Sequence, residues 1–390
     1  MKKITVVLIA LTLCLRVLAQ EELRIHHINV EDGDATLIGI YDVATHHYKS
    51  TILIDGGASN PNDLLLPYLR TVMATHVNYV VLTHYHKDHY NGLLALKDGR
   101  LTADSVIDPG AEGGPAAMEV ATPWLDVVKT QHHSRNFVSF GTAKTSIGHK
   151  LTLGTAGGLP VVLECVAGWG NTLNGQGITP DPKPQKSNAN NFTLAFVLTC
   201  GQFRYFIGGD LGGKTESEYI DQETALISDF TKEFPVAWSW NHTTSASGHL
   251  CGFKADHHGS EHSNNQAFMN SLSPAITITS AGKQPSWHLP SPAYLDRLAQ
   301  VSALSGNRGV YFTNLYDFAH TPSKSTADSL FSHRPQTSYS YGNAMAGQKS
   351  SYLIKVPTAN LANKSAFQVY RVDDAGARMT LLAGFQCHGK

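Results

Sequence analysis

The chain has 390 residues, of which 42% are hydrophobic and 16% are charged, and its formal net charge at pH 7 is −1. This balance is typical of a globular protein and excludes a chain that is disordered over most of its length. It also excludes an overall attraction to polyanions, although a local basic patch could still bind a nucleic acid.

The first 19 residues have the order of a secretory signal. Two lysines lie among residues 1–3, an apolar run covers residues 4–15, and the small residue Ala19 precedes Gln20. We therefore expect cleavage near Ala19 and export to the periplasm or the cell exterior. The apolar run is too short to cross a bilayer, so no transmembrane anchor is expected. Loss of residues 1–19 removes the three positive charges of Lys2, Lys3 and Arg16, which changes the formal net charge from −1 to −4.

Four cysteines follow the signal segment, namely Cys165, Cys200, Cys251 and Cys387. In an exported protein this even number permits two disulfides, for which three connectivities are possible. Reduced thiols that are buried in a core are the other interpretation. The sequence alone leaves both interpretations open.

The first half of the chain alternates strand-like and helix-like patterns. Strand-like runs cover residues 23–30, 35–40 and 50–54, a helix is expected over 62–74, and a buried strand follows at 79–82. This order predicts a mixed α/β fold built in layers. Residues 99–190 have weaker patterns: a helix is expected over 123–132, and residues 168–190 read as a long loop.

The second half contains two expected hairpins. The runs 191–198 and 203–207 are joined by a turn at 199–202, and a closing C-terminal hairpin pairs 351–356 with 366–372. A buried strand is expected over 275–280 and a helix over 292–302. With no repeat of fixed short period, we expect residues 20–390 to form a single domain.

The strongest chemical signal is an H-x-H-x-D-H cluster directly after the apolar run 79–82, formed by His84, His86, Asp88 and His89. A strand's period of two places both His84 and His86 on one side, and a turn into a helix brings Asp88 and His89 to a second position. One cluster can therefore serve two ions. Imidazole and carboxylate without thiolate suit Zn²⁺, Mn²⁺ or Fe. A histidine-rich surface loop is the alternative, which the strand-to-helix junction disfavours.

These motifs, in this order, resemble those of the metallo-β-lactamase-fold hydrolases, and among them the branch of ComEC-type competence proteins and their exported relatives. The resemblance covers residues 27–374. Gly33–Ile38 resembles the opening run of that branch, although Glu31-Asp32 replaces its Gly-Gln. Residues 53–57 are similar to the first motif, whose aspartate, here Asp55, supports the metal loop. The resemblance implies a four-layer αββα fold.

The resemblance also implies the remaining ligands. Asp210, which follows two glycines, matches the carboxylate that bridges two ions. Residues 257–260 look like the fifth motif, in which one histidine, His257 or His258, binds metal and the other contacts substrate or the groups that support the ligands. Which histidine has which role stays open. Where many relatives carry a further histidine ligand, this chain has Asn190-Asn191.

The expected function is that of an exported hydrolase that uses two divalent ions, Zn²⁺ or Mn²⁺, to activate water. Asp88 is expected to bind one ion near that water, and His258 or His288 to stabilise an oxyanion or protonate the leaving group. For His288 a surface role is the alternative, because Leu289 is inserted in the His-Pro element of the family that this histidine resembles. The resemblance favours a phosphodiester substrate, either a small molecule or a nucleic acid, and no protein partner is evident. Hydrolysis of a carbon ester, lactone or β-lactam is one alternative, and a non-enzymatic metal-binding protein is another. No nucleophilic-serine elbow or phosphate-binding P-loop motif is present.

Overall fold

The computed structural model describes most of the chain after residue 20. It covers residues 21–60, 62–110, 122–132, 136–139, 147–173, 188–216, 218–233, 250–282, 289–301, 304, 309–314, 350–358, 366–373 and 376–387. The expected signal segment and His288 lie outside the described residues. Among the described helices, none is long and apolar enough to span a membrane.

The first of two sheets has nine strands, in the order β17-β16-β15-β1-β2-β3-β4-β5-β6. The strand β1 (Glu21–His27) pairs antiparallel with both β2 (Thr36–Asp42) and β15 (Ser351–Pro357), so distant parts of the sequence are neighbours in this sheet. From β3 onward the neighbouring strands are parallel. The other strands of this sheet are β3 (His47–Ile54), β4 (His76–Val81), β5 (Thr102–Asp108), β6 (Asn136–Ser139), β16 (Ala366–Val372) and β17 (Met379–Gln386).

The second sheet has eight strands, in the order β14-β13-β12-β11-β10-β8-β7, with β9 paired to β8. Its parallel part runs from β11 to β14, and its antiparallel part contains β7, β8 and β10. The strands are β7 (Lys150–Ala156), β8 (Leu159–Gly168), β9 (Asn171–Thr172), β10 (Ala195–Cys200), β11 (Phe203–Ile207), β12 (Gly252–Lys254), β13 (Ile276–Thr279) and β14 (Val310–Phe312).

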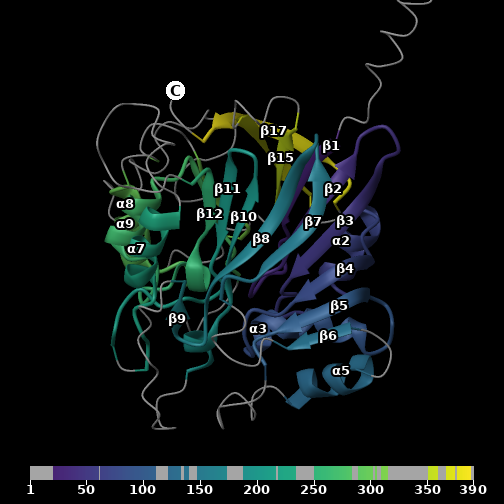
Figure 1. Cartoon of the computed structure of the whole chain (residues 1–390), viewed down its shortest axis with the longest axis horizontal. Coiled ribbons are helices and arrows are strands. Elements are labelled where there is room, and N and C mark those ends of the chain that lie inside the picture. The colour runs from purple at the N-terminus through teal and green to yellow at the C-terminus, as the bar shows by residue number, and fades with distance from the viewer. Residues whose placement is uncertain are drawn as a thin grey trace, which may run out of the picture.

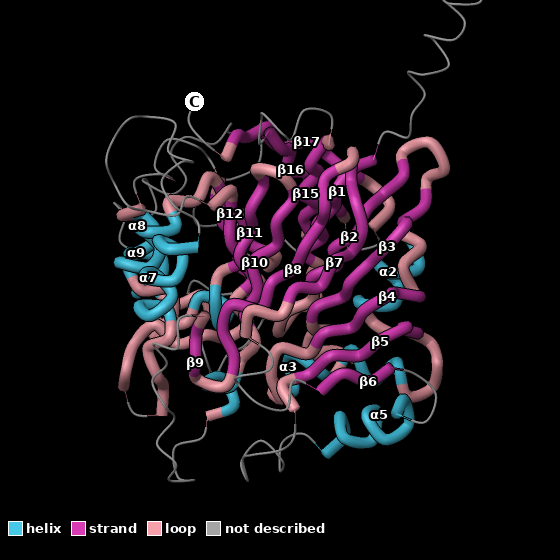
Figure 2. The backbone as a smooth tube through the Cα atoms, viewed as in Figure 1, coloured by secondary structure: helices cyan, strands magenta, loops and turns pink. Residues whose placement is uncertain are grey.

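Helices cover the outer face of each sheet, which gives four layers (Figure 1, Figure 2). On the first sheet lie α2 (Leu65–Thr71) and α5 (Thr122–His132), and on the second lie α7 (Glu223–Glu233), α8 (Gln266–Leu272) and α9 (Pro292–Ala299). The short helix α3 (Lys87–Tyr90) lies at the end of the sandwich opposite the C-terminal strands (Figure 1). The expected αββα layering is therefore confirmed.

Three apolar clusters hold these layers together. One lies between the sheets, where Ile38 and Ile52 pack with Phe196 and Ile207. The other two lie between each sheet and its helices. Strands in the middle of the sandwich contribute to two clusters at once, because successive side chains point to opposite faces. This explains why their sequences are continuously apolar rather than alternating.

Several element boundaries differ from those expected. The predicted strand 191–198 begins only at Ala195, because residues Ala189–Phe192 form a 3₁₀ turn, η4. The predicted helix 62–74 is shorter, as α2 ends at Thr71. The closing hairpin of β15 and β16 is present and gains a third strand, β17. Between residues 99 and 190 the structure adds five strands, β5 to β9, where only a helix and a long loop were expected.

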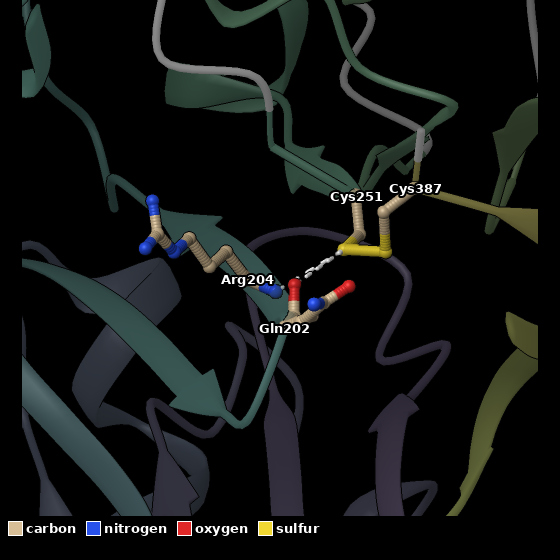
Figure 3. The surroundings of a disulfide bond; sticks show 4 residues. All are labelled: Gln202, Arg204, Cys251 and Cys387. Atoms are coloured by element: carbon tan, nitrogen blue, oxygen red, sulfur yellow. Dashed lines mark hydrogen bonds between the residues drawn. A yellow bond between two sulfur atoms is a disulfide. The ribbon is translucent and has the colours of Figure 1, made fainter. Parts of the chain in front are cut away.

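A disulfide joins Cys251, just before β12, to Cys387, just after β17 (Figure 3). The two cysteines are 136 residues apart in sequence, and the backbone N–H of Arg204 donates a 3.1 Å hydrogen bond to Cys251 Sγ. Cys165 and Cys200 are buried free thiols. One of the two permitted disulfides is thus formed, and it ties the end of the first sheet to the second sheet.

Candidate metal centre

The predicted ligands meet at the carboxyl ends of strands from both sheets. His84 and His86 follow β4, and Asp210 follows β11. His257 and His258 follow β12 in a short 3₁₀ turn, η6 (Asp256–Gly259). Because β3 and β4 are parallel, as are β11 and β12, their loops emerge at the same edge of each sheet. The sandwich thereby brings residues that are far apart in sequence to one buried point.

The two carboxylate oxygens of Asp210 face two different sets of imidazoles. Oδ2 lies 3.7 Å from Nε2 of His84 and 3.7 Å from Nε2 of His257. Ligand atoms of His84, His86 and Asp210 all lie within 4.8 Å of one another. This group is called the Oδ2 side.

The Oδ1 side contains the other two predicted imidazole ligands. Asp210 Oδ1 lies 3.3 Å from Nε2 of His89 and 3.6 Å from Nε2 of His258. A carboxylate oxygen of Asp88 lies 3.2 Å from Nε2 of His258 and 3.8 Å from Nε2 of His89. Asp210 is therefore placed between two groups of potential ligands.

The donor set fits a pair of divalent cations. Ligand atoms that are about 2.0–2.2 Å from one tetrahedral ion lie roughly 3.4 Å from each other, which is the spacing seen on each side. Nε2 of His84 and His89, and Oδ1 of Asp210, are buried with no hydrogen-bond partner among the described residues. Buried polar atoms without partners are rare unless an ion or water satisfies them.

In His89 and His258 the outer ring nitrogen, Nδ1, points away from the centre and has a hydrogen-bond partner. The other nitrogen of each ring, Nε2, therefore faces the centre. His89 Nδ1 lies 2.8 Å from Asp55 Oδ2, and His258 Nδ1 lies 3.0 Å from the carbonyl oxygen of Ser280. Asp55 also accepts hydrogen bonds from the backbone and hydroxyl of Thr83. Such partners fix the orientation of a metal-binding imidazole. Asp55 thus supports the loop from outside the centre.

The carboxylates and imidazoles of the centre shift one another's pKa values. Burial acts to raise the pKa of Asp210, but the imidazoles of His89 and His258 hold it well below its usual value. Conversely, burial acts to lower the pKa of His258, and Asp210 and Asp34 raise it to about 9. On the Oδ2 side burial dominates and lowers the pKa of His257 to about 4. That ring is neutral at pH 7 and has a lone pair available for a cation.

An unusual backbone presents His257 and His258 together. Both have left-handed conformations, with φ of 47° and 52°, which non-glycine residues rarely adopt. The backbone N–H of His257 donates a 3.0 Å hydrogen bond to the carbonyl of Gly209, which holds the turn against the loop of Asp210. The two rings are 6.1 Å apart and inclined by 71°. Adjacent residues can therefore face opposite sides of one carboxylate.

Asn190 belongs to the Asn190-Asn191 pair, which stands where the sequence resemblance leads one to expect a further histidine ligand. It is 1% exposed, and its Nδ2 lies 3.3 Å from Nε2 of His257. The departure from the expected ligand pattern and the first histidine of η6, His257, thus lie side by side.

Two buried charges at the centre were not singled out from the sequence. Asp34 belongs to the loop before β2, and Lys254 is the last residue of β12. A carboxylate oxygen of Asp34 lies within 4.8 Å of ligand atoms of His89, Asp210 and His258. The available signal was a lysine placed between apolar residues directly before the histidine motif.

Residues 30–103 match the family model of the Metallo-beta-lactamase superfamily. This span contains the H-x-H-x-D-H cluster and ends before Asp210. Together with the four layers, the match shows that the chain carries a metallo-β-lactamase superfamily domain with the corresponding fold. Among curated proteins, none matches the sequence.

Solved structures give more distant likenesses. A mutant of CmlA beta-hydroxylase is 14% identical with a TM-score of 0.41, over 76% of this chain and 52% of that chain. The metallo-beta-lactamase fold protein YhfI from Bacillus subtilis is 11% identical with a TM-score of 0.41, over 74% of this chain and 95% of that one. Unliganded yeast PDE1 is 11% identical with a TM-score of 0.38, over 75% and 87% of the two chains. This chain spans about half the length of the hydroxylase.

Proposed function

We propose that this chain, which carries a metallo-β-lactamase superfamily domain, is an exported hydrolase that uses two divalent ions, Zn²⁺ or Mn²⁺, to cleave phosphodiesters. The observation that carries the proposal is the placement of Asp210 between two sets of potential ligands. Its carboxylate oxygens lie 3.3–3.7 Å from four imidazole nitrogens. One bridging carboxylate and two flanking sets are what a dinuclear centre needs.

The geometry supports a division of the ligands between the two ions. His84, His86 and His257 would hold one ion through the Oδ2 side, and Asp88, His89 and His258 would hold the other through the Oδ1 side. His257 would supply the imidazole ligand that is absent at Asn190. Both histidines of η6 would then be ligands, whereas the sequence resemblance expected only one.

Two bound cations would supply Lewis acidity and an activated water. The residues of this chain would then orient the reactants. Asp88, whose side chain is 26% exposed while that of Asp210 is 1% exposed, is the carboxylate best placed to hold a water at the centre. With Nδ1 of His258 directed to Ser280, the protein keeps the ring nitrogen that faces Asp88 fixed. A proton donor at His288 remains a proposal, because that residue lies outside the described part of the chain.

The phosphodiester preference rests on the sequence resemblance to ComEC-type proteins. Support for export comes from the order of charged, apolar and small residues in the first 19 positions. The Cys251–Cys387 disulfide is also of the kind that persists in oxidising compartments. N-terminal sequencing of protein from the producing cell would test export, since an intact Met1 on a cytoplasmic protein contradicts it.

A substrate panel tests the activity. The purified protein, loaded with Zn²⁺ or Mn²⁺, is offered bis-p-nitrophenyl phosphate, nitrocefin and a lactone, with and without chelator. We expect the phosphodiester to be cleaved fastest and the chelator to abolish turnover. Faster cleavage of nitrocefin or the lactone would overturn the substrate proposal and leave the metal centre standing. No turnover of any ester by a protein that binds two ions would indicate a metal-binding protein instead.

A further inference from the structure

Asp34 and Lys254 form a buried ion pair that connects the two sheets beneath the metal centre. Their side chains are only 3% and 1% exposed, and Lys254 Nζ contacts Asp34 Oδ2. The same Nζ donates a 3.0 Å hydrogen bond to the carbonyl oxygen of Gly209. Because Gly209 directly precedes Asp210, the lysine holds the backbone that carries the bridging carboxylate.

The second oxygen of Asp34 faces the outer ring nitrogen of His258. Asp34 Oδ1 is buried with no hydrogen-bond partner among the described residues, and it lies 3.7 Å from Nδ1 of His258. It belongs with His89, Asp210 and His258 to one group of potential ligands, which is the Oδ1 side. In the described structure, the group of potential ligands on the Oδ2 side consists of His84, His86 and Asp210, and it contains no carboxylate besides Asp210.

A buried ammonium group beside two cations is electrostatically costly unless an anion compensates it. Asp34 provides this compensation, because it contacts Lys254 directly. The loop of Asp34 is also fixed in place, since its backbone N–H donates a 3.3 Å hydrogen bond to the carbonyl of Asp88. The pair therefore touches the loops of both carboxylates that serve the Oδ1 side, Asp88 and Asp210.

We propose that Asp34 and Lys254 are positioning residues for the ion on the Oδ1 side. Lys254 fixes the Gly209 carbonyl and hence the orientation of Asp210. Asp34 offsets the charge of Lys254 and places its second oxygen beside the outer ring nitrogen of His258. This inference rests on the dinuclear centre proposed above and adds to it a residue pair that sets the affinity of one ion relative to the other.

The test is a titration of the metal-free protein with Co²⁺, in which visible absorption reports ligand geometry and elemental analysis reports the number of bound ions. For Asp34→Asn we expect the second ion to bind about tenfold or more weakly, with an altered spectrum, because an uncompensated lysine then faces that site. In the double variant Asp34→Asn/Lys254→Met the affinity should recover in part, because the buried charge is gone. The spectrum should still differ from that of the unaltered protein, since Gly209 is no longer held.

The matched control is the pair of Asp42 and Lys49, which lie 3.6 Å apart at the opposite end of β2. Neither Asp42→Asn nor Lys49→Met should change the cobalt spectrum or the affinities. If Asp34→Asn does not fold, the double variant Asp34→Asn/Lys254→Met tests the proposal instead. It is expected to fold, because it buries no uncompensated charge.

The outcomes separate this inference from the proposed function. An unaltered protein that binds fewer than two ions would overturn the dinuclear centre and this inference with it. An unaltered protein that binds two ions, with identical affinities and spectra in the double variant, would overturn this inference alone. This inference would also be overturned if Asp34→Asn folds and the double variant binds the second ion no more tightly than it does.

Discussion

At the scale of single residues, one carboxylate organises the candidate centre. Asp210 is 1% exposed, and each of its oxygens faces imidazoles that come from both halves of the chain. An isolated carboxylate in this position would be costly, because burial penalises its charge. The imidazoles offset part of that cost, and bound cations would offset more of it.

Asp210→Asn should therefore lose bridging charge while it keeps the shape of the side chain. We expect bound metal to fall from two ions to about one, and turnover to drop about a hundredfold or more, with little change in the circular dichroism spectrum. Elemental analysis and the phosphodiester assay measure both effects. His86→Ala should cost at least as much activity, whereas the exposed carboxylate Asp104 serves as a control whose amide variant changes nothing. Two ions and full turnover in Asp210→Asn would show that it does not bridge.

The pair His257 and His258 makes a second prediction. If each serves a different side of Asp210, His257→Ala and His258→Ala should each retain about one ion, and the cobalt spectra of the two variants should differ. If only one of them binds metal, the other variant will keep two ions and its original spectrum.

His26, a buried histidine outside the predicted metal ligands, predicts acid sensitivity. His26 lies between the hydroxyl groups of Tyr68 and Tyr48, at 2.8 Å and 2.6 Å, and burial, with a smaller contribution from Arg24, lowers its pKa to about 3. The unfolded chain therefore takes up a proton on this ring before the folded chain does. The stability that the neutral ring contributes is complete above about pH 6.5 and is lost as the pH falls toward 3.

His26→Gln should flatten this dependence. As the pH falls, the free energy of unfolding of the metal-free variant should decrease less steeply than that of the unaltered metal-free chain. The two slopes should differ by up to about 1.4 kcal/mol per pH unit. Urea unfolding at several values between pH 6.5 and 4 measures the slope, with the exposed His76→Gln as a control. Equal slopes in both variants and the unaltered chain would contradict the role given to His26.

At the scale of elements, close packing of loops places the ligands. The loop before β2 touches α3 at Gly33, whose φ is +90°. A Cβ atom there would lie 1.7 Å from the carbonyl oxygen of Asp88. Only glycine allows this approach, and the approach holds the short helix that carries Asp88 and His89.

Gly33→Ala should therefore cost more than a left-handed backbone alone. Gly99 is a matched control, because its φ is +76° and a Cβ atom there would meet nothing within 4 Å. We expect about 1–2 kcal/mol for Gly99→Ala, from the backbone, and a further 1–3 kcal/mol for Gly33→Ala, from the clash. Thermal unfolding and metal content measure the difference. Equal losses in both variants would mean that the contact with Asp88 is not needed.

At the scale of the whole molecule, the ligands come from both sheets of the sandwich. His84 and His89 follow β4 of the first sheet, whereas Asp210 and His258 follow β11 and β12 of the second. Ions bound between them would stabilise the native arrangement but not the unfolded chain. Metal binding and folding should therefore be thermodynamically linked.

Removal of metal should accordingly lower the melting temperature. At free metal about a hundred times the dissociation constant, one site adds about 2.7 kcal/mol to the free energy of unfolding. Calorimetry with and without chelator measures the change, and readdition of Zn²⁺ or Mn²⁺ should restore it. An unchanged melting temperature would contradict binding between the sheets.

Local sequence patterns identified residues that lie together at the candidate centre better than they identified the strands of the sheets. Motifs after apolar strands identified His84, His86, Asp88, His89 and Asp210, which the structure brings together. Strands β7 and β8 were missed because partly exposed residues interrupt their apolar pattern, although the Gly157-Gly158 turn that joins them into a hairpin is a local signal. The roles of Asp34 and Lys254 could not be read from local patterns, because their contact joins residues that are 220 positions apart.

The Cys251–Cys387 bond also makes a closed covalent ring of the chain that contains both η6 and the last strand. A protease that cuts once inside this ring opens it without releasing a fragment. On a denaturing gel the product would migrate as one species until a reductant is added and as two pieces afterwards. A single cut before Cys251 would instead release a piece at once, so the pair of gels locates a nick relative to the ring.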